Sequence, residues 1–322
     1  MVRGLVVRAY SSFYYVRPTG GDHSSASCDD PPLECRVRGR LKQCNQKEAG
    51  TERLRPWQRR WLREPPSIPP VVVGDWVQVE PLGARTGVIV AVEQRRSLLL
   101  RPLLANVETL VVVFALVSPD PSPLLVDRFL VTVEKSGIRP IVVFNKADLV
   151  SEDQCQRWVQ AYRAAGYPVV ATSACTGQGL SELAALLSGG ISAFAGPSGV
   201  GKSALLKRFF PGLDLASGEV SAKTGRGRHT TRYAQLLPLG GGWVADTPGF
   251  STPLPVAVEP ARLAQLFPEM RVLLGQCRFS GCLHRREPGC AVRAAVDAGK
   301  ILPARYDSYL RILEEVEAQA LW

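Results

Sequence analysis

The first hundred or so residues carry short apolar runs of the kind that form β-strands. GLVVRAYSSFYYVR has the β-branched and aromatic content of a hairpin, and LECRVRGRLKQ alternates charged and apolar positions as a half-exposed strand does. Three more runs, VVVGDWVQVE, TGVIVAVE and SLLLRP, are separated by glycine and proline turns. Short strands without a helical pattern predict an OB-type β-barrel over residues 1–103. Residues 45–70 are rich in Arg, Trp and Pro, and we interpret them as a long basic loop inserted in that barrel.

Between residues 104 and 255, strand-like apolar runs alternate with amphipathic helical segments. Strands are expected at 109–117, 139–149, 167–174 and 190–196, and helices at 122–137, 151–166 and 179–188. Ser151, followed by two acidic residues, is the expected N-cap of the second of these helices. This alternation predicts an α/β layered sheet. Helical patterns at 259–270 and 303–321 predict a mainly helical C-terminal domain over residues 256–322.

Hydropathy and charge narrow the choice of partners. The longest apolar run, at 110–117, is too short to span a bilayer, and the N-terminus lacks a secretory signal pattern. We therefore expect a cytoplasmic protein without a membrane partner. The net charge is +10, and residues 1–103 hold 17 Lys and Arg against 10 Asp and Glu. This uneven basic surplus favours a polyanion such as nucleic acid, or it serves solubility, and charge alone leaves both open.

A phosphate-binding loop, GPSGVGKS, lies between an expected strand and an expected helix. The spacing G-x-x-x-x-G-K-[ST] lets backbone N–H groups surround an anion, and the helix N-terminus adds to the site. Lys202 is placed to reach the β- and γ-phosphates as a catalytic residue, and Ser203 to ligate Mg²⁺. The expected contacts with the nucleotide are Gly196, Pro197, Ser198, Gly199, Val200, Gly201, Lys202, Ser203 and Ala204.

A guanine-reading motif precedes this loop, where Asn145, Lys146, Ala147 and Asp148 match N-K-x-D at the end of an expected strand. The Asp148 carboxylate can accept from two N–H groups that guanine has and adenine lacks. Asn145 can bond another edge of the base, and the Lys146 stem can pack on its face. The next strand ends in a stretch that resembles the loop contacting guanine O6 through a backbone N–H: Thr172, Ser173 and Ala174. Beside a P-loop, these motifs predict a GTP site.

The motif DTPG follows the P-loop and supplies the pattern D-x-x-G. Asp246 is expected to hold Mg²⁺, and the Gly249 N–H to contact a γ-phosphate. Between the two motifs lie Thr230 and Thr231, either of which can be the threonine that ligates Mg²⁺ in the triphosphate state. We favour Thr231.

The position after DTPG is Phe250, where Ras-like enzymes have a glutamine that orients the attacking water. A phenylalanine cannot do so. His229 is the candidate catalytic residue for this role, since a neutral imidazole accepts a hydrogen bond from water. The alternative is that His229 contacts a partner, and the sequence leaves both open.

The motifs run in an unusual order, with N-K-x-D and T-S-A before the P-loop, the switch threonine and D-x-x-G. In most GTPases the P-loop comes first. A parallel sheet permits this reordering when the old chain ends lie close together and new ends open at a loop. We therefore predict a circularly permuted P-loop GTPase domain over residues 104–255. Its D-x-x-G loop would lead directly into the C-terminal region, which could receive the nucleotide state through a short tether.

A cluster of metal-ligand residues lies near the C-terminus: Cys277, Cys282, His284 and Cys290. Three thiolates and one imidazole make a closed tetrahedral set, which is typical of one structural Zn²⁺. The loop around them has few apolar residues, so it needs such a staple to be ordered. Unrelated free cysteines near a surface histidine are the alternative. Arg278, Arg285 and Arg286 would point positive charge outward, as in an RNA-contacting knuckle.

Over nearly its whole length the chain resembles the circularly permuted, small-ribosomal-subunit-dependent GTPases of the RsgA (YjeQ) family. The resemblance rests on the motif order, the Cys–His cluster and the segments FYYV, RGRLK, VGDWV, RPLLANVE and GRGRHTT. It implies an OB-fold, a permuted GTPase domain and a C-terminal zinc domain. It also implies hydrolysis of GTP to GDP and phosphate, stimulated by the small ribosomal subunit during late maturation of that particle. Contacts with rRNA are implied for both flanking domains, and we expect a monomer that uses Mg²⁺ with GTP.

Some positions depart from the pattern of that family. DTPG stands where DSPG is more frequent, HTTR where HTTT is commoner, and the 45–70 insert is longer and more basic than expected. A competing hypothesis is a nucleotide-dependent RNA-binding module whose hydrolysis is incidental, which the missing glutamine at Phe250 keeps open. A metabolic P-loop kinase is disfavoured by the N-K-x-D and D-x-x-G motifs together.

Overall fold

The computed structural model describes residues 1–19, 31–39, 68–100, 102–212, 234–250, 256 and 258–320, with backbone only at 247–250 and 320. Most of the 45–70 insert lies outside the described residues, as do His229, Thr230 and Thr231. The chain forms two compact units. The first unit comprises Met1–Thr109, Ala184–Phe194 and Phe209–Phe250, and the second comprises Leu110–Leu183, Ala195–Arg208 and Ser251–Trp322. The domain boundaries near 103 and 255 stay predictions.

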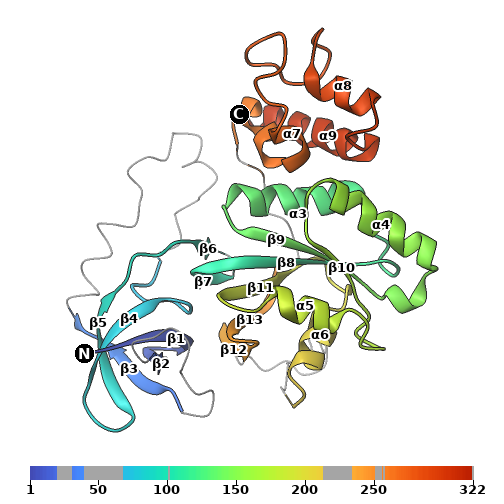
Figure 1. Cartoon of the computed structure of the whole chain (residues 1–322). Coiled ribbons are helices and arrows are strands. Elements are labelled where there is room, and N and C mark those ends of the chain that lie inside the picture. Colours follow the sequence, from blue (N-terminus) through green and yellow to red (C-terminus); the bar gives the residue numbers. More distant parts are fainter. Residues whose placement is uncertain are drawn as a thin grey trace, which may run out of the picture. The chain divides into compact units, whose positions relative to one another are not determined.

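The first unit contains the predicted barrel, drawn in blue to cyan in Figure 1. Its strands are β1 (Val2–Tyr10), β2 (Phe13–Pro18), β3 (Leu33–Val37), β4 (Trp76–Pro81) and β5 (Thr86–Val92). They pair in the order β1-β2-β3-β5-β4, and β4 pairs back with β1 to close the barrel. The inward positions are mostly valines, among them Val6, Val16, Val77 and Val79, because β-branched side chains pack well on a pleated surface. The short hairpin β6 (Leu98–Leu100) and β7 (Leu103–Ala105) follows.

The segment VGDWV owes its sequence to a close backbone approach and a buried carboxylate. Gly74 has φ +91°, and a Cβ there would lie 2.1 Å from the Ala105 carbonyl oxygen, so only glycine fits. The next residue, Asp75, is fully buried and accepts hydrogen bonds from Arg95 Nε at 2.7 Å and from the Val72 N–H at 2.8 Å. The Asp75–Arg95 pair therefore fixes the entry to β4.

The first unit also holds a hairpin of β12 (Gln235–Leu239) and β13 (Gly242–Phe250) and most of β11 (Ile191–Ala195). In this unit the strands follow the order β11-β13-β12-β1 and then continue into the barrel. The hairpin is therefore joined to the barrel by β1. The structure continues β13 to Phe250, so DTPG lies within a strand, whereas the sequence pattern placed the motif after one.

The second unit contains an α/β sheet with β10 (Val169–Ala171), β9 (Arg139–Asn145) and β8 (Val107–Ala115) in that order, β8 entering the unit at Leu110. The pair β9–β10 is parallel. The helices of this region are α3 (Pro123–Lys135), α4 (Glu152–Ala164), α5 (Leu180–Leu186) and α6 (Lys202–Phe209), with the 3₁₀ turn η1 (Ala147–Leu149). Figure 1 shows α3 and α4 on one face of the sheet and α6 on the other. Ser151 caps α4 as predicted, since its side chain accepts a hydrogen bond from the Gln154 N–H.

The C-terminal region is helical, as predicted, and comprises η2 (Pro260–Leu266), α7 (Pro268–Arg271), α8 (Ala291–Asp297) and α9 (Pro303–Ala320). Helix α9 packs against α3 and η2. Its apolar stripe of Tyr309, Ile312, Leu313 and Val316 shares one buried core with Val131 of α3. Among the described residues, no helix combines the length and the apolar character that crossing a bilayer requires.

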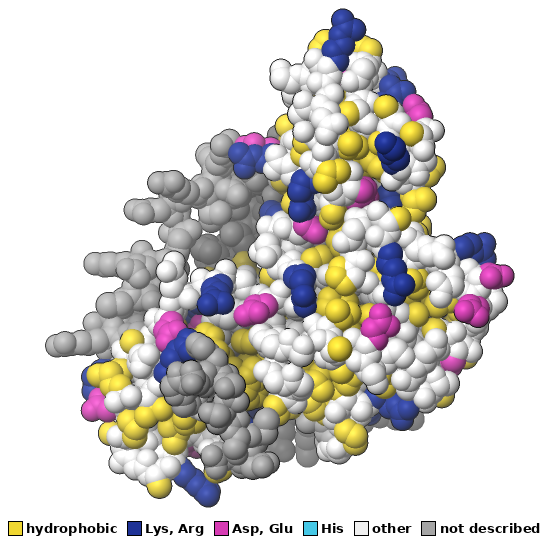
Figure 2. Space-filling model, in the orientation of Figure 1, with side chains coloured by type: hydrophobic (Ala, Val, Ile, Leu, Met, Phe, Trp, Pro, Cys, Tyr) yellow, Lys and Arg dark blue, Asp and Glu magenta, His cyan; other side chains and the backbone are white. Residues whose placement is uncertain are grey.

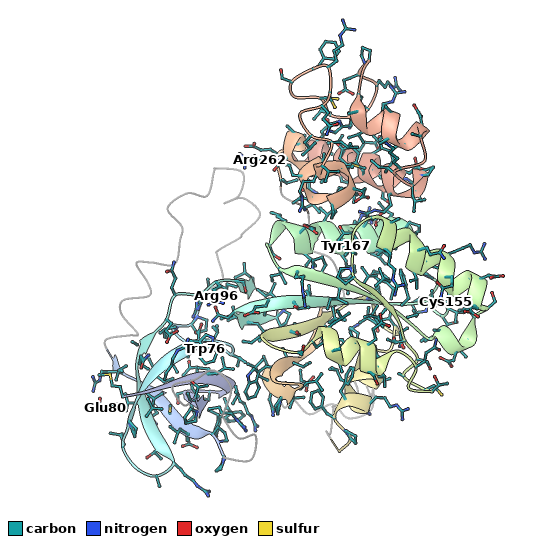
Figure 3. All side chains as sticks on the ribbon, in the orientation of Figure 1. Trp76, Glu80, Arg96, Cys155, Tyr167 and Arg262 are labelled. Carbon is teal, nitrogen blue, oxygen red and sulfur yellow. The ribbon has the colours of Figure 1, made fainter. Side chains whose placement is uncertain are left out.

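A buried ion cluster fastens this region to α3. Arg305 of α9 is 3% exposed and binds Glu269 of α7 through Nε at 2.7 Å and Nη2 at 3.1 Å. Its Nη1 donates to Asp127 of α3, whose side chain is fully buried and also accepts from the Tyr162 hydroxyl at 3.0 Å. Burial raises the pKa of Asp127, and the charge of Arg305 opposes that rise. The guanidinium also lies 5.5 Å from the ring centre of Tyr167, a residue that Figure 3 labels.

We expect Arg305→Met to lower the free energy of unfolding by about 3–5 kcal/mol, because it leaves two buried carboxylates without their cation. Adding Asp127→Asn and Glu269→Gln should recover most of this loss, since the cost comes from the uncompensated charges. Arg271→Met is the matched control. Arg271 pairs with Glu134 at 2.6 Å but is 49% exposed, so its removal should cost less than about 1 kcal/mol. Urea unfolding measures all of these variants, and equal losses for Arg305→Met and Arg271→Met would contradict the expectation.

Candidate nucleotide and metal sites

The P-loop follows β11 and leads into α6, as predicted, and its last two residues, Lys202 and Ser203, are the first two of that helix. Gly196 has φ +139°, and a Cβ there would lie 2.1 Å from the Val113 carbonyl oxygen of β8, so glycine is required at the start of the loop. Gly199 and Gly201 have φ +79° and +95°, conformations in which glycine is unstrained. A glycine-rich loop of this kind can turn backbone N–H groups toward an anion.

Lys202 reaches back over this loop. Its Nζ donates to the carbonyl oxygens of Gly196 and Pro197, both at 2.6 Å. Burial lowers the pKa of Lys202 to about 8, because a partly desolvated ammonium loses hydration. An anionic phosphate beside it would favour the charged form, which is the chemistry that the P-loop motif predicts.

Asn145 joins three loops of the second unit. Its side chain is 1% exposed, and its Nδ2 donates to the Val200 carbonyl of the P-loop at 2.9 Å. Its Oδ1 accepts from Thr172 Oγ1 and from the Ala174 N–H, both at 3.2 Å. The structure thus brings the P-loop, N-K-x-D and T-S-A together around one amide. The sequence motif predicted a contact with guanine for Asn145 and gave no signal of this joining role.

The other members of N-K-x-D lie around η1. Lys146 has φ +63°, and its Nζ donates to the Ser118 carbonyl oxygen in the loop between β8 and α3. Asp148 is exposed in η1, which leaves its carboxylate accessible. The Ala147 N–H donates to the Thr172 carbonyl oxygen at 3.0 Å, so N-K-x-D and T-S-A are also joined through their backbones.

Asp246 belongs to the first unit, where it lies on β13 directly opposite Gln235 of β12. Burial raises the pKa of its carboxyl group. The P-loop and the two guanine loops belong to the second unit. The predicted roles of Gly249 and the switch threonines concern a backbone contact and residues outside the described ones, so they stay predictions.

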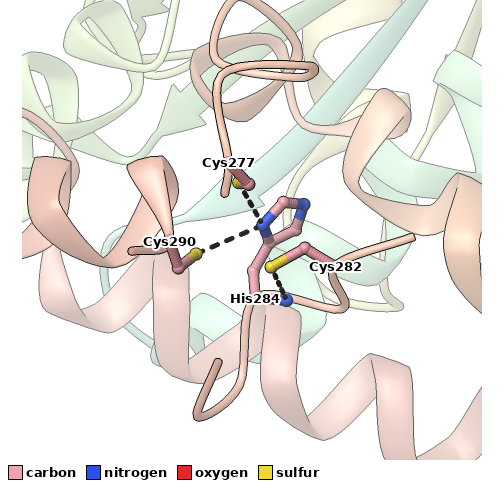
Figure 4. A group of neighbouring side chains, drawn as sticks. All are labelled: Cys277, Cys282, His284 and Cys290. Carbon is pink, nitrogen blue, oxygen red and sulfur yellow. Dashed lines mark hydrogen bonds between the residues drawn. The ribbon is translucent and has the colours of Figure 1, made fainter. Parts of the chain in front are cut away.

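The predicted metal ligands gather in the C-terminal region (Figure 4). The ligand atoms of Cys277, Cys282, His284 and Cys290 lie within 4.8 Å of one another. His284 Nδ1 is 3.4 Å from the Sγ of Cys290 and 3.6 Å from that of Cys277. Tetrahedral zinc with sulfur and nitrogen ligands would need ligand atoms roughly 3.5–3.8 Å apart. The cluster can therefore hold one metal ion.

The loop that carries these ligands is held by α9. The Tyr306 hydroxyl donates to the His284 carbonyl oxygen at 2.6 Å, and the Tyr309 hydroxyl to that of Leu283 at 2.9 Å. Burial lowers the pKa of His284, which favours the neutral imidazole that binds metal. These contacts support the ligands from outside, as neighbours of metal sites commonly do.

Two of the arginines near the cluster, Arg285 and Arg278, have different neighbours. Arg285 is bound to Glu317 of α9 at 2.5 Å, so the outward charge that the sequence suggested for it is neutralised. Arg278 lies over the ring of Phe279, which is 47% exposed. On the face shown in Figure 2, basic side chains occur singly over the surface, beside acidic ones.

Comparison with known proteins agrees with this geometry. A family model described as RsgA GTPase matches residues 92–254. A protein of Moorella thermoacetica named small ribosomal subunit biogenesis GTPase RsgA is 46% identical over 319 residues, covering 99% of this chain and 98% of its own. A protein of the same name from Geobacillus kaustophilus is 41% identical over 320 residues, covering 98% of each chain.

Solved structures give the same result. That of YloQ, described as a circularly permuted GTPase, has a TM-score of 0.76 at 32% identity and covers 99% of this chain and 96% of its own. YjeQ from Thermotoga maritima has a TM-score of 0.75 at 34% identity, with 98% of both chains covered. The predicted permuted GTPase fold is thereby confirmed.

We expect Asn145→Ala to weaken binding of GDP and GTP equally, by about 1–3 kcal/mol, because it leaves buried partners unpaired on the P-loop and on T-S-A. Titration with fluorescent guanine nucleotides measures this. Leu149→Ala is the control, since Leu149 is 62% exposed beside the motif and should bind as the wild type does. A loss confined to GTP would contradict the joining role.

Proposed function

Because the chain belongs to the RsgA family of circularly permuted GTPases, we propose that it binds the small ribosomal subunit and hydrolyses GTP in response. The chain is a GTP hydrolase, and its place is in biogenesis of the small ribosomal subunit. The observation that carries the proposal is the joining of the P-loop, N-K-x-D and T-S-A by the Asn145 amide. These three loops supply phosphate binding and guanine selection in one unit.

The proposed roles of the nucleotide-binding residues follow from their chemistry. Lys202 would neutralise the β- and γ-phosphates, and Ser203 would ligate the Mg²⁺ that accompanies GTP. Asp148 would select guanine by accepting from its N–H groups, while Asp246 would hold Mg²⁺ through water. Thr231 is the favoured switch threonine.

The water-orienting residue is the least usual part of the proposed mechanism. Phe250 stands where Ras-like enzymes have glutamine. We assign the role to His229, whose neutral imidazole can accept a hydrogen bond from the attacking water. Turnover would then be slow until the bound particle brings this residue into place.

The Cys–His cluster would hold one structural Zn²⁺ through Cys277, Cys282, His284 and Cys290. The spacing of their ligand atoms supports this assignment. All four positions would be filled by protein, so the metal would stabilise the fold of the loop and take no part in hydrolysis.

Contact with rRNA is proposed for the outer face of the barrel. The pairs Tyr10↔Phe13 and Arg8↔Tyr15 lie opposite each other on β1 and β2. The guanidinium of Arg8 lies 5.7 Å from the Tyr15 ring centre, and that of Arg36 lies 4.6 Å from the Phe13 ring centre. Within the described part of the chain, neither Arg8 nor Arg36 pairs with a carboxylate. Unpaired arginines beside aromatic rings suit the phosphates and bases of RNA.

A cytoplasmic monomer fits this partner, since ribosomal particles are assembled in the cytoplasm and the proposed surfaces lie on one chain. The alternative, an RNA-binding module with incidental hydrolysis, is favoured only by Phe250. It predicts binding of the particle without a change in turnover.

The direct test measures GTP turnover by the full chain with and without purified small ribosomal subunits. We expect a large stimulation, and His229→Ala should lower the stimulated rate at least about tenfold, or about 1.4 kcal/mol, with nucleotide affinity intact. An unstimulated wild type would favour the alternative function. Full stimulation of His229→Ala would remove this residue from the mechanism.

The zinc assignment has its own test. The purified chain should contain about one zinc per molecule, and Cys290→Ser should lose most of it together with thermal stability. Cys175→Ser is the control, because this thiol is exposed and lies outside the cluster. Equal zinc content in the two variants would contradict the assignment.

A further inference from the structure

The hairpin β12–β13, which carries Asp246, is attached to the barrel at two described points. The first is a backbone pairing, in which Arg8 of β1 lies opposite Gln235 of β12. The second is a side-chain stack, in which the Arg17 guanidinium of β2 lies 5.5 Å from the ring centre of Trp243 on β13. Both lie within the first unit.

Strand β1 makes the first attachment possible because two different strands, β4 and β12, pair along the same edge of it. Val2–Leu5 pair with β4 and close the barrel, whereas Arg8 pairs with β12. One continuous strand therefore serves both the barrel wall and the hairpin. A displacement of β1 must be accommodated in β12, because ladder pairing is set by discrete backbone hydrogen bonds.

The pairings align into one row across the strands. Asp246 lies opposite Gln235, Gln235 opposite Arg8, and Arg8 opposite Tyr15. Directly opposed residues place their side chains on the same face of a sheet. Asp246 is thus two strands away from Arg8, which lies on the proposed RNA face.

We propose that β12 couples this RNA face to Asp246, with Gln235 and the Arg17–Trp243 stack as the positioning contacts. The inference rests on the proposed function, because it requires an RNA-bearing particle on the barrel. RNA that orders Arg8 and Tyr15 fixes β1, and β1 fixes the hairpin that holds the Mg²⁺-binding carboxylate. The RNA then regulates hydrolysis without touching the nucleotide.

Thermodynamic reciprocity makes the coupling measurable without hydrolysis. If RNA binding favours one position of Asp246, the nucleotide that favours the same position must strengthen RNA binding by the same factor. The quantity to measure is the ratio of affinities for small ribosomal subunits with GDP and with a non-hydrolysable GTP analogue. A direct contribution of Arg17 to RNA binding cancels in this ratio.

The experiment measures co-sedimentation of the full chain with purified small subunits in both nucleotide states. For the wild type we expect affinities that differ at least about fivefold. Arg17→Ala and Trp243→Leu should each bring the ratio to within about twofold of one, with binding of fluorescent GTP unchanged. Trp243→Phe retains a ring for the stack and should keep most of the ratio. The double variant should show the same affinity ratio as either single variant, because both substitutions remove the same contact.

A control removes a second arginine–aromatic contact that does not touch the hairpin, together with the ion pair between Arg3 and Glu93 at 2.7 Å. Arg3 lies 4.3 Å from the ring centre of Trp76 within the barrel, and Arg3→Ala should keep the wild-type ratio. The coupling is overturned if Arg17→Ala and Trp243→Leu keep that ratio, or if Arg3→Ala abolishes it equally. Equal affinity of the wild type for subunits with both nucleotides would overturn the coupling and leave the proposed function standing. A wild type that binds no subunits with either nucleotide overturns the proposed function as well.

Discussion

The buried charge of Arg305 is the constraint on which the second unit depends. A guanidinium this deeply enclosed is tolerated only with carboxylates at both ends, and these come from Asp127 of α3 and Glu269 of α7. Helix α3 connects β8 to β9, the strand that ends in Asn145. The C-terminal region is thus packed onto the same structure that presents the guanine loop. Its attachment relies on packing with α3, in addition to the chain connection after DTPG.

A corresponding constraint acts in the first unit, where β1 belongs both to the barrel and to the sheet of β12 and β13. This arrangement matters because the circular permutation places DTPG last among the GTPase motifs. DTPG lies on β13, which pairs with β12, and β12 pairs in turn with β1, so this strand groups with the barrel. The guanine and P-loop motifs group with the metal cluster instead. Each proposed RNA-binding region therefore shares a compact unit with a different part of the GTPase machinery.

The sequence predicted the parts whose spacing encodes their geometry. The P-loop glycines, the Ser151 cap and the Cys–His ligand set each depend on a few neighbouring residues, and the structure places them as expected. The sequence did not predict contacts made across long separations. Nothing near Arg305 in the sequence indicates a buried ion pair, because its partners Asp127 and Glu269 are distant in the chain. The joining role of Asn145 has the same origin, since its partners lie on two other loops.

The strand of Asp246 belongs to the same compact unit as the barrel, whereas the P-loop, N-K-x-D and T-S-A belong to the other unit. Native-state hydrogen exchange at increasing denaturant measures this directly, because amides that open together report one cooperative unit. We predict that the amides of β12 and β13 open with those of β1 and β2, and that the amides of β9, α3 and α9 open as a separate group. Opening of β12 and β13 together with β9 and α3, independently of the barrel strands, would show that the Asp246 strand belongs with N-K-x-D and T-S-A instead.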